Sequence, residues 1–505
     1  MTPLSTERPL SGAAADVEVA IVGSGFSGLC LGIRLKQAGI DNFVILEKDP
    51  VFGGTWRVNT YPGAACDVPS HLYSFSFAQN ANWSRTFPTQ PELLAYTEQL
   101  VADHGLLPHI RLNAGMLGAE FEESQGLWRV RTGQGEFTAK VLVSATGALS
   151  RPALPAVNGL AQFEGKLFHS AQWDHGYDLA GRRVAVIGTG ASAIQFIPEI
   201  VKKVAQLDVY QRTAPWILPR PDRPVSAAER WLLGKLKPLQ WLYRGINYLQ
   251  YEMRLIAFAK APSLMKLIQR QALRHIAAQI PDNAELRRKL TPDYTMGCKR
   301  ILIMNSYYPA LTRPNVALYT DGIAQVRTHS ILTRGGEERA VDAIILGTGF
   351  DVEHSLGSIE VRGRNGRLLS QSAEGGLEAY KGTALPGFPN FFMIAGPNTG
   401  LGHNSMIYMI ESNVNYLMAA IRAIREQGLH SVEVRPEVTR DYNLGIQQRL
   451  AGTVWNSGCK SWYLAASGKN NTLWPGFTFE YRRITRRFDP QSYRVQGQAP
   501  AATAA

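Results

Sequence analysis

The sequence predicts an α/β fold with two nested Rossmann-like dinucleotide-binding domains and a helical insertion. Three observations support this prediction. A Gly-rich loop at residues 23–28 follows a short apolar run, a similar loop at 188–193 follows a second apolar run, and residues 226–280 have helical spacing. A Gly-rich loop between a strand and a helix is typical of dinucleotide-binding βαβ units. With 505 residues, the chain is also too long for one ordinary domain.

The N-terminal part of the chain predicts the first βαβ unit. Residues 16–22 predict a buried parallel strand, 26–38 have helical spacing that stops at Gly39, and 42–46 predict a second strand that ends at Glu47. Residues 140–144 predict another buried strand of the same domain. The Pro-rich segment 151–155 predicts a linker out of it.

The second domain begins with a strand at 183–187, a helix at about 191–204 and a strand at 207–210. After the helical stretch, residues 340–346 return to a strand, and 388–397 predict a strand that enters a tight Gly-Pro turn. The simplest layout is nested. We expect the first dinucleotide domain at 1–150 and 385–505 (with the C-terminal tail), the second at 151–225 and 300–384, and the insertion at 226–299.

The net charge of +12 is concentrated in one stretch. Residues 220–300 hold 16 Lys and Arg against 6 Asp and Glu, together with several aromatic residues. Three interpretations remain open: a solvated basic helical subdomain, a peripheral membrane contact through residues 226–280, and a nucleic-acid site. No nucleic-acid partner is expected, because no recognition motif accompanies the charge. No run of eighteen apolar residues predicts a membrane span, and no apolar stretch after the first Met predicts a signal peptide.

The four cysteines, Cys30, Cys66, Cys298 and Cys459, are widely scattered. No pair has metal-ligand spacing, and no disulfide framework is visible. We therefore expect reduced thiols in a cytoplasmic protein without a metal site.

The first Gly-rich loop predicts a dinucleotide with an unphosphorylated ribose, FAD or NAD. The first Gly allows a tight turn, the second lets the backbone approach a pyrophosphate, and the third lets the helix pack on the strand. Glu47 follows at the end of the next strand, where a carboxylate accepts hydrogen bonds from a ribose diol. The candidate residues are Gly23, Ser24, Gly25, Phe26, Ser27, Gly28 and Glu47.

The second loop predicts NADPH instead. Its residues Gly188, Thr189, Gly190, Ala191 and Ser192 form a G-x-G-x-x-A pattern with the following alanine. At the ribose position the chain has Arg212 and Thr213, with no carboxylate. A cation suits a 2′-phosphate, which a carboxylate would repel.

Two further motifs carry a family resemblance. Phe163, Gly165, His169 and Trp173 fill the pattern F-x-G-x3-H-x3-W-[P/D], and residues 53–67 fill the pattern [AG]-G-x-W-x4-[FY]-P-[GM]-x3-D. Both patterns resemble the fingerprints of type I Baeyer–Villiger monooxygenases, which are class B flavoprotein monooxygenases. The segments 396–405 and 468–475 look most like the branch that includes hydroxyacetophenone monooxygenases.

The resemblance implies an NADPH- and O2-dependent flavin monooxygenase that inserts oxygen next to a ketone carbonyl and gives an ester or lactone. Arg300 falls on the family's catalytic position, where a guanidinium stabilises a C4a-peroxyflavin anion. Asp67 is the expected partner that orients Arg300. His169 is expected to act in a linker between the two nucleotide domains, and not in the chemistry itself.

The family also implies further cofactor contacts. For FAD these are Gly54, Thr55, Trp56, Asp67 and Tyr73. For NADP they are Gln195, Lys299 and Trp462. A small-molecule ketone and O2 are the expected reactants, and the enzyme is expected to be a monomer or dimer. The alternatives are a flavin monooxygenase that oxygenates sulfides or amines or hydroxylates alkyl chains and, more remotely, a non-catalytic flavin redox sensor.

Overall fold

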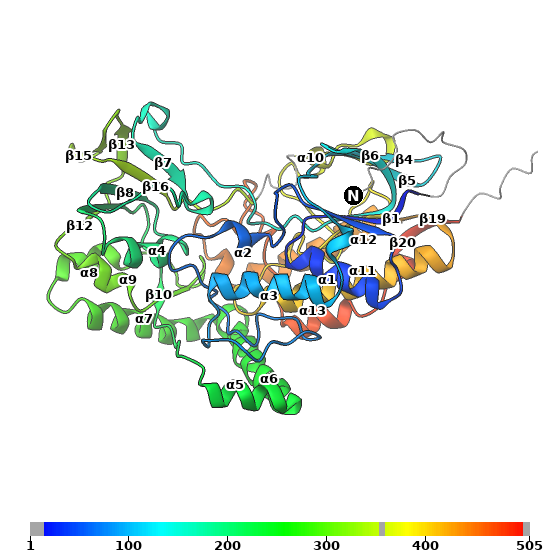
Figure 1. The fold of residues 1–505 in the computed structure, drawn as a ribbon, viewed down its shortest axis with the longest axis horizontal. Coiled ribbons are helices and arrows are strands. Elements are labelled where there is room, and N and C mark those ends of the chain that lie inside the picture. Colours follow the sequence, from blue (N-terminus) through cyan, green and yellow to red (C-terminus); the bar gives the residue numbers. More distant parts are fainter. Residues whose placement is uncertain (1–14, 353–358, 498–505) are drawn as a thin grey trace, which may run out of the picture.

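The computed structural model describes residues 15–352 and 359–497. Two main sheets lie in separate lobes, and a helical arm extends below them (Figure 1). Both sheets contain parallel strands connected by helices, which is the arrangement that the two Gly-rich loops predict. The α/β fold class is therefore confirmed.

The first sheet has eight strands in the order β17-β4-β5-β6-β1-β2-β3, and β18 also pairs with β6. Strands β1, β2, β3, β6 and β18 pair in parallel, whereas β4 and β5 add an antiparallel extension. The bounds are β1 Val17–Val22, β2 Phe43–Leu46, β3 Ile110–Arg111, β4 Met116–Glu122, β5 Leu127–Thr132, β6 Gly135–Ser144, β17 Glu360–Arg362 and β18 Phe391–Met393.

Three helices pack beside this sheet: α1 Phe26–Gln37, α3 Gln90–Asp103 and α11 Met406–Glu426. They share one apolar core with the strands, which includes Ile21, Leu31, Leu93 and Leu417. Because α11 comes from the C-terminal part, the first lobe is built from both ends of the chain.

The second sheet is fully parallel, in the order β12-β9-β8-β16-β7. An antiparallel sheet of β13, β14 and β15 lies beside it (Figure 1). The strands are β7 Lys166–His169, β8 Arg183–Ile187, β9 Gln206–Tyr210, β12 Val316–Tyr319, β13 Ile323–Val326, β14 Ser330–Thr333, β15 Glu338–Ala340 and β16 Ala343–Leu346. Helices α4 Ala193–Ile200 and α9 Tyr307–Leu311 pack on one another in this lobe.

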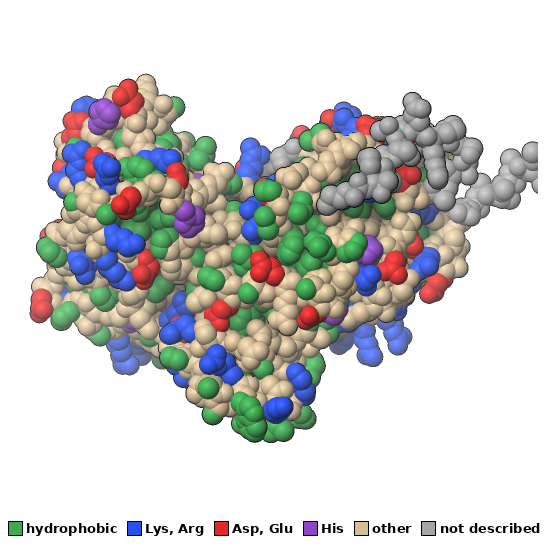
Figure 2. All heavy atoms as spheres, viewed as in Figure 1, with side chains coloured by type: hydrophobic (Ala, Val, Ile, Leu, Met, Phe, Trp, Pro, Cys, Tyr) green, Lys and Arg blue, Asp and Glu red, His purple; other side chains and the backbone are tan. Residues whose placement is uncertain are grey.

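Between β10 Ile217–Leu218 and β11 Leu302–Ile303, which pair in parallel, the chain forms the helical arm. The arm contains α5 Ala227–Lys235, α6 Lys237–Met253, a π-helix at Ile256–Lys260, α7 Met265–Gln279 and α8 Ala284–Leu290. Hydrophobic side chains gather at its outer end, where α5 and α6 lie (Figures 1 and 2). None of the helices among the described residues has both the length and the apolar character needed to cross a membrane.

The remaining elements are short or belong to the C-terminal part. They are α2 Thr55–Val58, α10 Leu369–Ser372, α12 Pro436–Ala451, α13 Thr478–Ile484, and the antiparallel pair β19 Leu429–Val434 and β20 Tyr493–Gly497.

The structure differs from the elements expected from the sequence at two places. Helix α4 is shorter than the expected 191–204, and Pro198 within it removes one N–H donor from the helical ladder. The chain also returns to the first sheet earlier than residue 385, because β17 at 360–362 already pairs with β4. The domain boundaries given above stay a prediction.

Candidate functional site

The first Gly-rich loop forms a tight cradle between β1 and α1. Gly23 has φ +110°, and a Cβ there would lie 2.6 Å from the Ala145 carbonyl oxygen. A Cβ on Gly28 would lie only 1.9 Å from the Gly23 carbonyl oxygen. Helix α1 begins at Phe26 without a side-chain cap, so its first N–H groups are available to a phosphate. The loop therefore fits a pyrophosphate.

Glu47 lies where β2 ends and is buried. Its carboxylate accepts hydrogen bonds from the Ser24 backbone N–H at 3.3 Å and from the Ser24 hydroxyl. The backbone N–H of Asp49 also donates to it, at 3.0 Å. These contacts hold the carboxylate against the Gly-rich loop, beside the expected position of the ribose.

The next motif, residues 53–67, packs directly on this loop. Gly54 has φ +58°, and a Cβ there would lie 2.7 Å from the Gly25 Cα. The Trp56 Nε1 donates to the Tyr73 hydroxyl at 3.2 Å, and the Tyr73 ring lies 5.5 Å from that of Phe26. Thr55 begins α2 immediately after Gly54. The structure thus brings together the residues expected to contact FAD.

The second Gly-rich loop repeats the arrangement between β8 and α4. Gly188 has φ +105°, and a Cβ there would lie 2.4 Å from the Gly347 carbonyl oxygen. At Gly190 a Cβ would meet its nearest neighbour only at 3.9 Å, so the approach to this backbone is open. Helix α4 also has no side-chain cap at Ser192. The Thr189 hydroxyl donates to the Thr213 carbonyl at 3.4 Å, which joins the loop to the expected position of the ribose.

Two cations expected at the 2′-phosphate come together from distant parts of the chain. Arg212 follows β9 and is exposed, and Lys299 lies with its Nζ 4.7 Å from the centre of the Tyr294 ring. Desolvation and then the charge of Arg212 lower the pKa of Lys299. Two cations that repel one another are a suitable binding site for an anion.

Gln195 on α4, an expected NADP contact, also bonds to the motif at 53–67, and its role toward NADP stays a prediction. Its side-chain amide donates to the Ala65 carbonyl at 2.9 Å and accepts from the Tyr61 hydroxyl at 3.0 Å. The close contact is possible because Gly63 has φ +79° and lacks a Cβ, which would lie 2.7 Å from the Gln195 carbonyl oxygen. Gln195 therefore joins the second Gly-rich unit to the motif at 53–67.

Arg300 and Asp67 form a bidentate ion pair. The Arg300 Nε donates to Asp67 Oδ2 at 3.0 Å, and Nη2 donates to Oδ1 at 2.7 Å. The two side chains are 41% and 25% exposed, so the pair faces open space and is not sealed inside the protein. This geometry fixes the guanidinium plane beside the loop that carries Trp56 and Tyr73.

The pair also keeps both groups charged. Although the pair is partly exposed, desolvation by neighbouring groups would by itself raise the pKa of Asp67, but the charge and hydrogen bonds of Arg300 lower that pKa below its ordinary value. The charge of Asp67 raises the pKa of Arg300, against the effect of desolvation. Arg300 is therefore a permanent cation at any working pH.

The fingerprint residues lie at the edge of the second lobe, and the expected coupling role of His169 between the two nucleotide domains stays a prediction. His169 ends β7, an edge strand of the second sheet, and is buried with its Nδ1 accepting from the Ala171 N–H at 3.1 Å. Trp173 packs against Phe196 of α4, with ring centres 5.3 Å apart. A Cβ on Gly165 would lie 2.4 Å from the Phe163 ring. The motif thus supports the second sheet and its helix.

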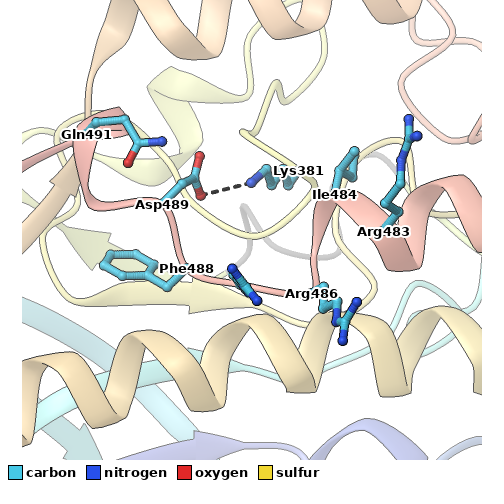
Figure 3. Close-up of a pocket in the computed structure, with 8 residues that line it drawn as sticks. Lys381, Arg483, Ile484, Arg486, Phe488, Asp489 and Gln491 are labelled. Atoms are coloured by element: carbon cyan, nitrogen blue, oxygen red, sulfur yellow. Dashed lines mark hydrogen bonds and ion pairs between the residues drawn. The ribbon is translucent and has the colours of Figure 1, made fainter.

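A cavity of about 440 Å³ lies elsewhere, in the C-terminal part (Figure 3). An ion pair between Lys381 and Asp489, 2.8 Å long, lies at its wall. None of the residues expected for catalysis or cofactor binding lines this cavity.

Within the described part of the chain, no group of His, Cys, Asp and Glu residues could hold a metal ion.

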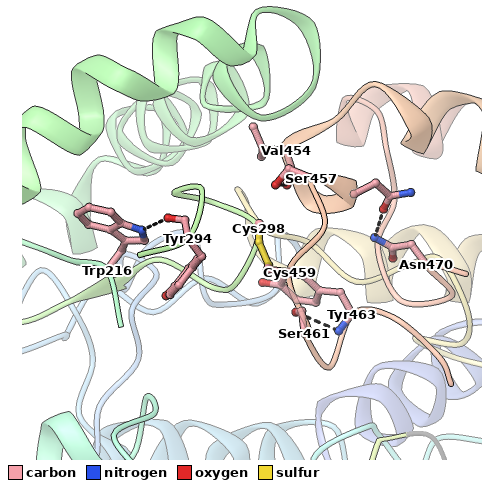
Figure 4. The surroundings of a disulfide bond; sticks show 10 residues. Trp216, Tyr294, Cys298, Val454, Ser457, Cys459, Ser461, Tyr463 and Asn470 are labelled. Carbon is pink, nitrogen blue, oxygen red and sulfur yellow. Dashed lines mark hydrogen bonds between the residues drawn. A yellow bond between two sulfur atoms is a disulfide. The ribbon is translucent and has the colours of Figure 1, made fainter. Parts of the chain in front are cut away.

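The sequence shows no pairing among the cysteines, but the structure pairs two of them. Cys298 and Cys459 form a disulfide across 161 residues (Figure 4). Cys30 and Cys66 are free and buried. Tertiary folding brings the two sulfurs together, and their spacing in the sequence shows no sign of it. The disulfide ties the segment of Lys299 and Arg300 to the segment of Ser461 and Tyr463.

Two residues beside the ion pair of Arg300 and Asp67 were not predicted as site residues from the sequence. Arg220 donates to the Cys66 carbonyl at 3.1 Å, and its charge helps to lower the pKa of Asp67. Tyr463 is buried beside Arg300: burial raises the pKa of its phenol to about 12, and the charge of Arg300 acts in the opposite direction. Trp462, an expected NADP contact, is 45% exposed and packs on Tyr463 with ring centres 4.6 Å apart. No motif signals Arg220, because only the fold places it there.

Comparisons with known proteins agree with this geometry. The profile of the pyridine nucleotide-disulphide oxidoreductase family matches residues 20–238. A Baeyer-Villiger monooxygenase of Pseudomonas aeruginosa is 52% identical over 491 residues, 97% of this chain and 93% of that protein. A Baeyer-Villiger monooxygenase of Streptomyces coelicolor is 49% identical over 487 residues, 96% of this chain and 94% of that protein.

Solved structures show the same fold. A steroid monooxygenase bound to NADP has a TM-score of 0.84 and 29% identity, covering 95% of this chain and 100% of that one. A closed cyclohexanone monooxygenase has a TM-score of 0.85 and 27% identity, covering 96% of this chain and 100% of that one. The relatives extend over nearly the whole chain, well beyond the two Gly-rich units. The chain therefore belongs to the Baeyer–Villiger monooxygenase family, as the motifs at 163–174 and 53–67 predict.

Proposed function

We propose that this enzyme uses NADPH and O2 to insert one oxygen atom next to a ketone carbonyl, with Arg300 as the residue that stabilises negative charge on oxygen. Its cofactors are FAD and NADPH. The observation that carries the role of Arg300 is its bidentate pairing with Asp67, next to the loop of Trp56 and Tyr73. Bound flavin activates O2 with electrons from NADPH.

Arg300 suits this role because its charge persists and its donors are planar. Nε and Nη2 are engaged by Asp67, and the guanidinium has a further nitrogen that can reach a reacting oxygen. A fixed cation stabilises the oxyanion that develops at the ketone carbon without reorganisation. Asp67 is a positioning residue: it holds the guanidinium plane and keeps the site from being strongly positive.

We assign NADPH to the second Gly-rich unit. Arg212 and Lys299 would pair with the 2′-phosphate, and the open backbone at Gly190 would accept the pyrophosphate. FAD would lie on the first unit with its ribose at Glu47. The Gly-rich loops, uncapped helices and positive φ angles fit both nucleotides.

The reactants are a small-molecule ketone, giving an ester or lactone, and O2. We propose a cytoplasmic location, because the NADPH on which the reaction depends is held there, and a monomer or dimer as the oligomeric state. The hydroxyacetophenone monooxygenase branch, which the segments at 396–405 and 468–475 resemble, makes aryl and acyclic ketones the first substrates to test.

The test separates flavin reduction from oxygen insertion. Arg300→Ala should still be reduced by NADPH at a rate near that of the wild type, but it should lose at least about 100-fold in ester formation and release hydrogen peroxide instead. Arg300→Lys, which keeps a charge but loses the planar pair with Asp67, should recover little. Ester formation by Arg300→Ala at the wild-type rate would disprove the assignment.

A further inference from the structure

Helix α6 has its polar face inside and its apolar face outside. The side chains of Gln240, Arg244, Tyr251 and Glu252 are buried. The opposite face carries large apolar side chains that are 49–59% exposed: Trp241, Leu242, Ile246, Leu249 and Met253. A helix on the surface of a soluble protein ordinarily buries its apolar stripe and exposes its polar one. In α6 this arrangement is reversed, so its outer face is suited to contact with an apolar partner.

Hydrogen bonds to the buried polar groups fix this orientation. Arg244 donates to the carbonyls of His71 and Ser74, at 2.5 and 2.8 Å. Glu252 accepts from the Asn404 side chain and from the Thr478 hydroxyl. Rotating α6 to hide its apolar side chains would leave a buried guanidinium and a buried carboxylate without partners, which is costly. The apolar face is therefore held outward.

The exposed apolar surface continues onto the neighbouring helices. Trp231 on α5 is 65% exposed, and Leu267 on α7 is 58% exposed. Of the twenty large apolar side chains that are exposed among the described residues, eleven lie between Trp231 and Leu273. In the space-filling view these hydrophobic side chains gather at the outer end of the arm, with Lys and Arg side chains beside them (Figure 2). A concentrated patch of this kind marks an interaction surface.

The charge of this region has one sign. Seven cationic side chains are exposed between residues 230 and 274: Lys235, Lys237, Arg254, Lys260, Lys266, Arg270 and Arg274. The single acidic residue in that range, Glu252, is 2% exposed. On α5 just before this range, Glu229 is 24% exposed and is paired with Arg223. Apolar side chains flanked by an excess of exposed cations match the chemistry of an anionic lipid surface.

We propose that helices α5, α6 and α7 of this arm, residues 227–279, bind the surface of an anionic lipid bilayer, with the apolar face of α5 and α6 at the boundary between headgroups and acyl chains. The apolar side chains would insert, and the lysines and arginines would pair with lipid phosphates. A second copy of the chain fits less well, because the same cations would face one another. Binding lies on the surface only, since α6 is far too polar on its inner face to span.

The test is flotation of the FAD-loaded protein with vesicles. The protein should float with vesicles of phosphatidylcholine mixed with phosphatidylglycerol, float much less with phosphatidylcholine alone, and dissociate as the salt concentration rises. Leu242→Glu with Leu249→Glu should abolish flotation. The matched control is Leu107→Glu with Leu444→Glu, which adds the same charges at leucines that are 59% and 56% exposed elsewhere, and it should float normally. NADPH oxidation should be unchanged in both variants.

Substitution of the exposed lysines provides a second part of the test. Lys235→Gln with Lys237→Gln should weaken partitioning onto anionic vesicles about 30-fold, since each cation contributes about 1 kcal/mol there. Lys202→Gln with Lys469→Gln, which removes two exposed lysines elsewhere, should have little effect. Equal flotation of all variants would overturn the proposal. The proposal would also be overturned if the protein did not float and formed a dimer that Leu242→Glu with Leu249→Glu converts to a monomer. The apolar face would then be a self-association surface.

Discussion

The two dinucleotide-binding units share a strand, a Gly-rich loop and a helix, but they differ where the second strand ends. In the first unit Glu47 is buried and bonded to Ser24. In the second, the exposed Arg212 occupies the equivalent region, and its charge lowers the pKa of Lys299. A carboxylate binds a ribose diol and cations bind a 2′-phosphate. On the assignments proposed above, one fold would select two different nucleotides through the charges near the end of the second strand.

The two units also differ in how closely the helix approaches the strand. The third position of the loop is Gly28 in the first unit and Ala193 in the second. A Cβ on Gly28 would overlap the Gly23 carbonyl, whereas α4 already accommodates the methyl group of Ala193. The cradle of the first unit is therefore tighter than that of the second.

The largest expected effect comes from adding a methyl group at Gly28, in the tighter of the two loops. Gly28→Ala should destabilise the protein by about 3 kcal/mol or more and release FAD, because the new methyl group would lie 1.9 Å from a backbone oxygen. Thermal unfolding and flavin content of the purified protein measure this. The reciprocal change, Ala193→Gly, should cost only about 1 kcal/mol. Similar losses in both variants would show that the two cradles are equally tight.

The next effect concerns the cations of the second unit. Arg212→Ala with Lys299→Ala should raise the KM for NADPH about 100-fold and leave the KM for NADH nearly unchanged, since two charge-assisted hydrogen bonds to the 2′-phosphate are lost. Steady-state oxidation of both nucleotides provides the measurement. Arg440→Ala, which removes an exposed arginine on α12, is the control. An equal rise for both nucleotides would place the two cations away from the 2′-phosphate.

A smaller effect is expected in the first unit. Glu47→Gln should keep the shape of the side chain but lose the charge that accepts from the ribose diol, so FAD affinity should fall about tenfold. Titration of the apoprotein with FAD measures this affinity. The KM for NADPH should not change; if it rises instead of FAD affinity falling, the two nucleotides are assigned to the wrong units.

The smallest effect is the pH dependence of the ion pair that lies between the units. The pKa of Asp67 is depressed in the folded protein, so the unfolded chain takes up its proton first as pH falls. The stabilisation is therefore present above the unfolded value of about 3.9 and is lost as pH falls through the folded pKa. Because the pair is partly exposed, the gain over Asp67→Asn should be at most about 1 kcal/mol. Denaturant unfolding of the two proteins at pH 7 and at pH 3 measures it. A gain that grows toward low pH would contradict the assigned direction.

Sequence patterns predicted the features that depend on residues close together in the chain. The strands at 16–22 and 183–187 are apolar runs that end at glycines with positive φ, and both lie within one residue of their predicted bounds. The partnership of Asp67 with Arg300 was expected from the family motifs, and the structure pairs the two side chains at hydrogen-bonding distance. The catalytic and cofactor roles of these residues stay predictions until the variants are measured.

Other features could not be predicted because they depend on which distant segments meet. Cys298 and Cys459 lie 161 residues apart, and nothing in the spacing pairs them. The amide of Gln195 bonds to Tyr61 and Ala65 of the other unit, which no spacing in the sequence indicates, and its expected contact with NADP stays a prediction. The charge at Arg220 was visible in the sequence, whereas its contact with the Cys66 carbonyl requires the folded loop.

The sequence by itself determined the two Gly-rich units, the charge at each ribose position and the family, because each depends on residue types at short, fixed spacings. Only the tertiary structure decided the direction in which α6 faces. Its apolar and polar stripes predict an amphipathic helix of either orientation, and the apolar stripe would ordinarily turn inward. The partners supplied by His71, Ser74, Asn404 and Thr478 reverse this, because buried charges without hydrogen bonds cost more than exposed leucines.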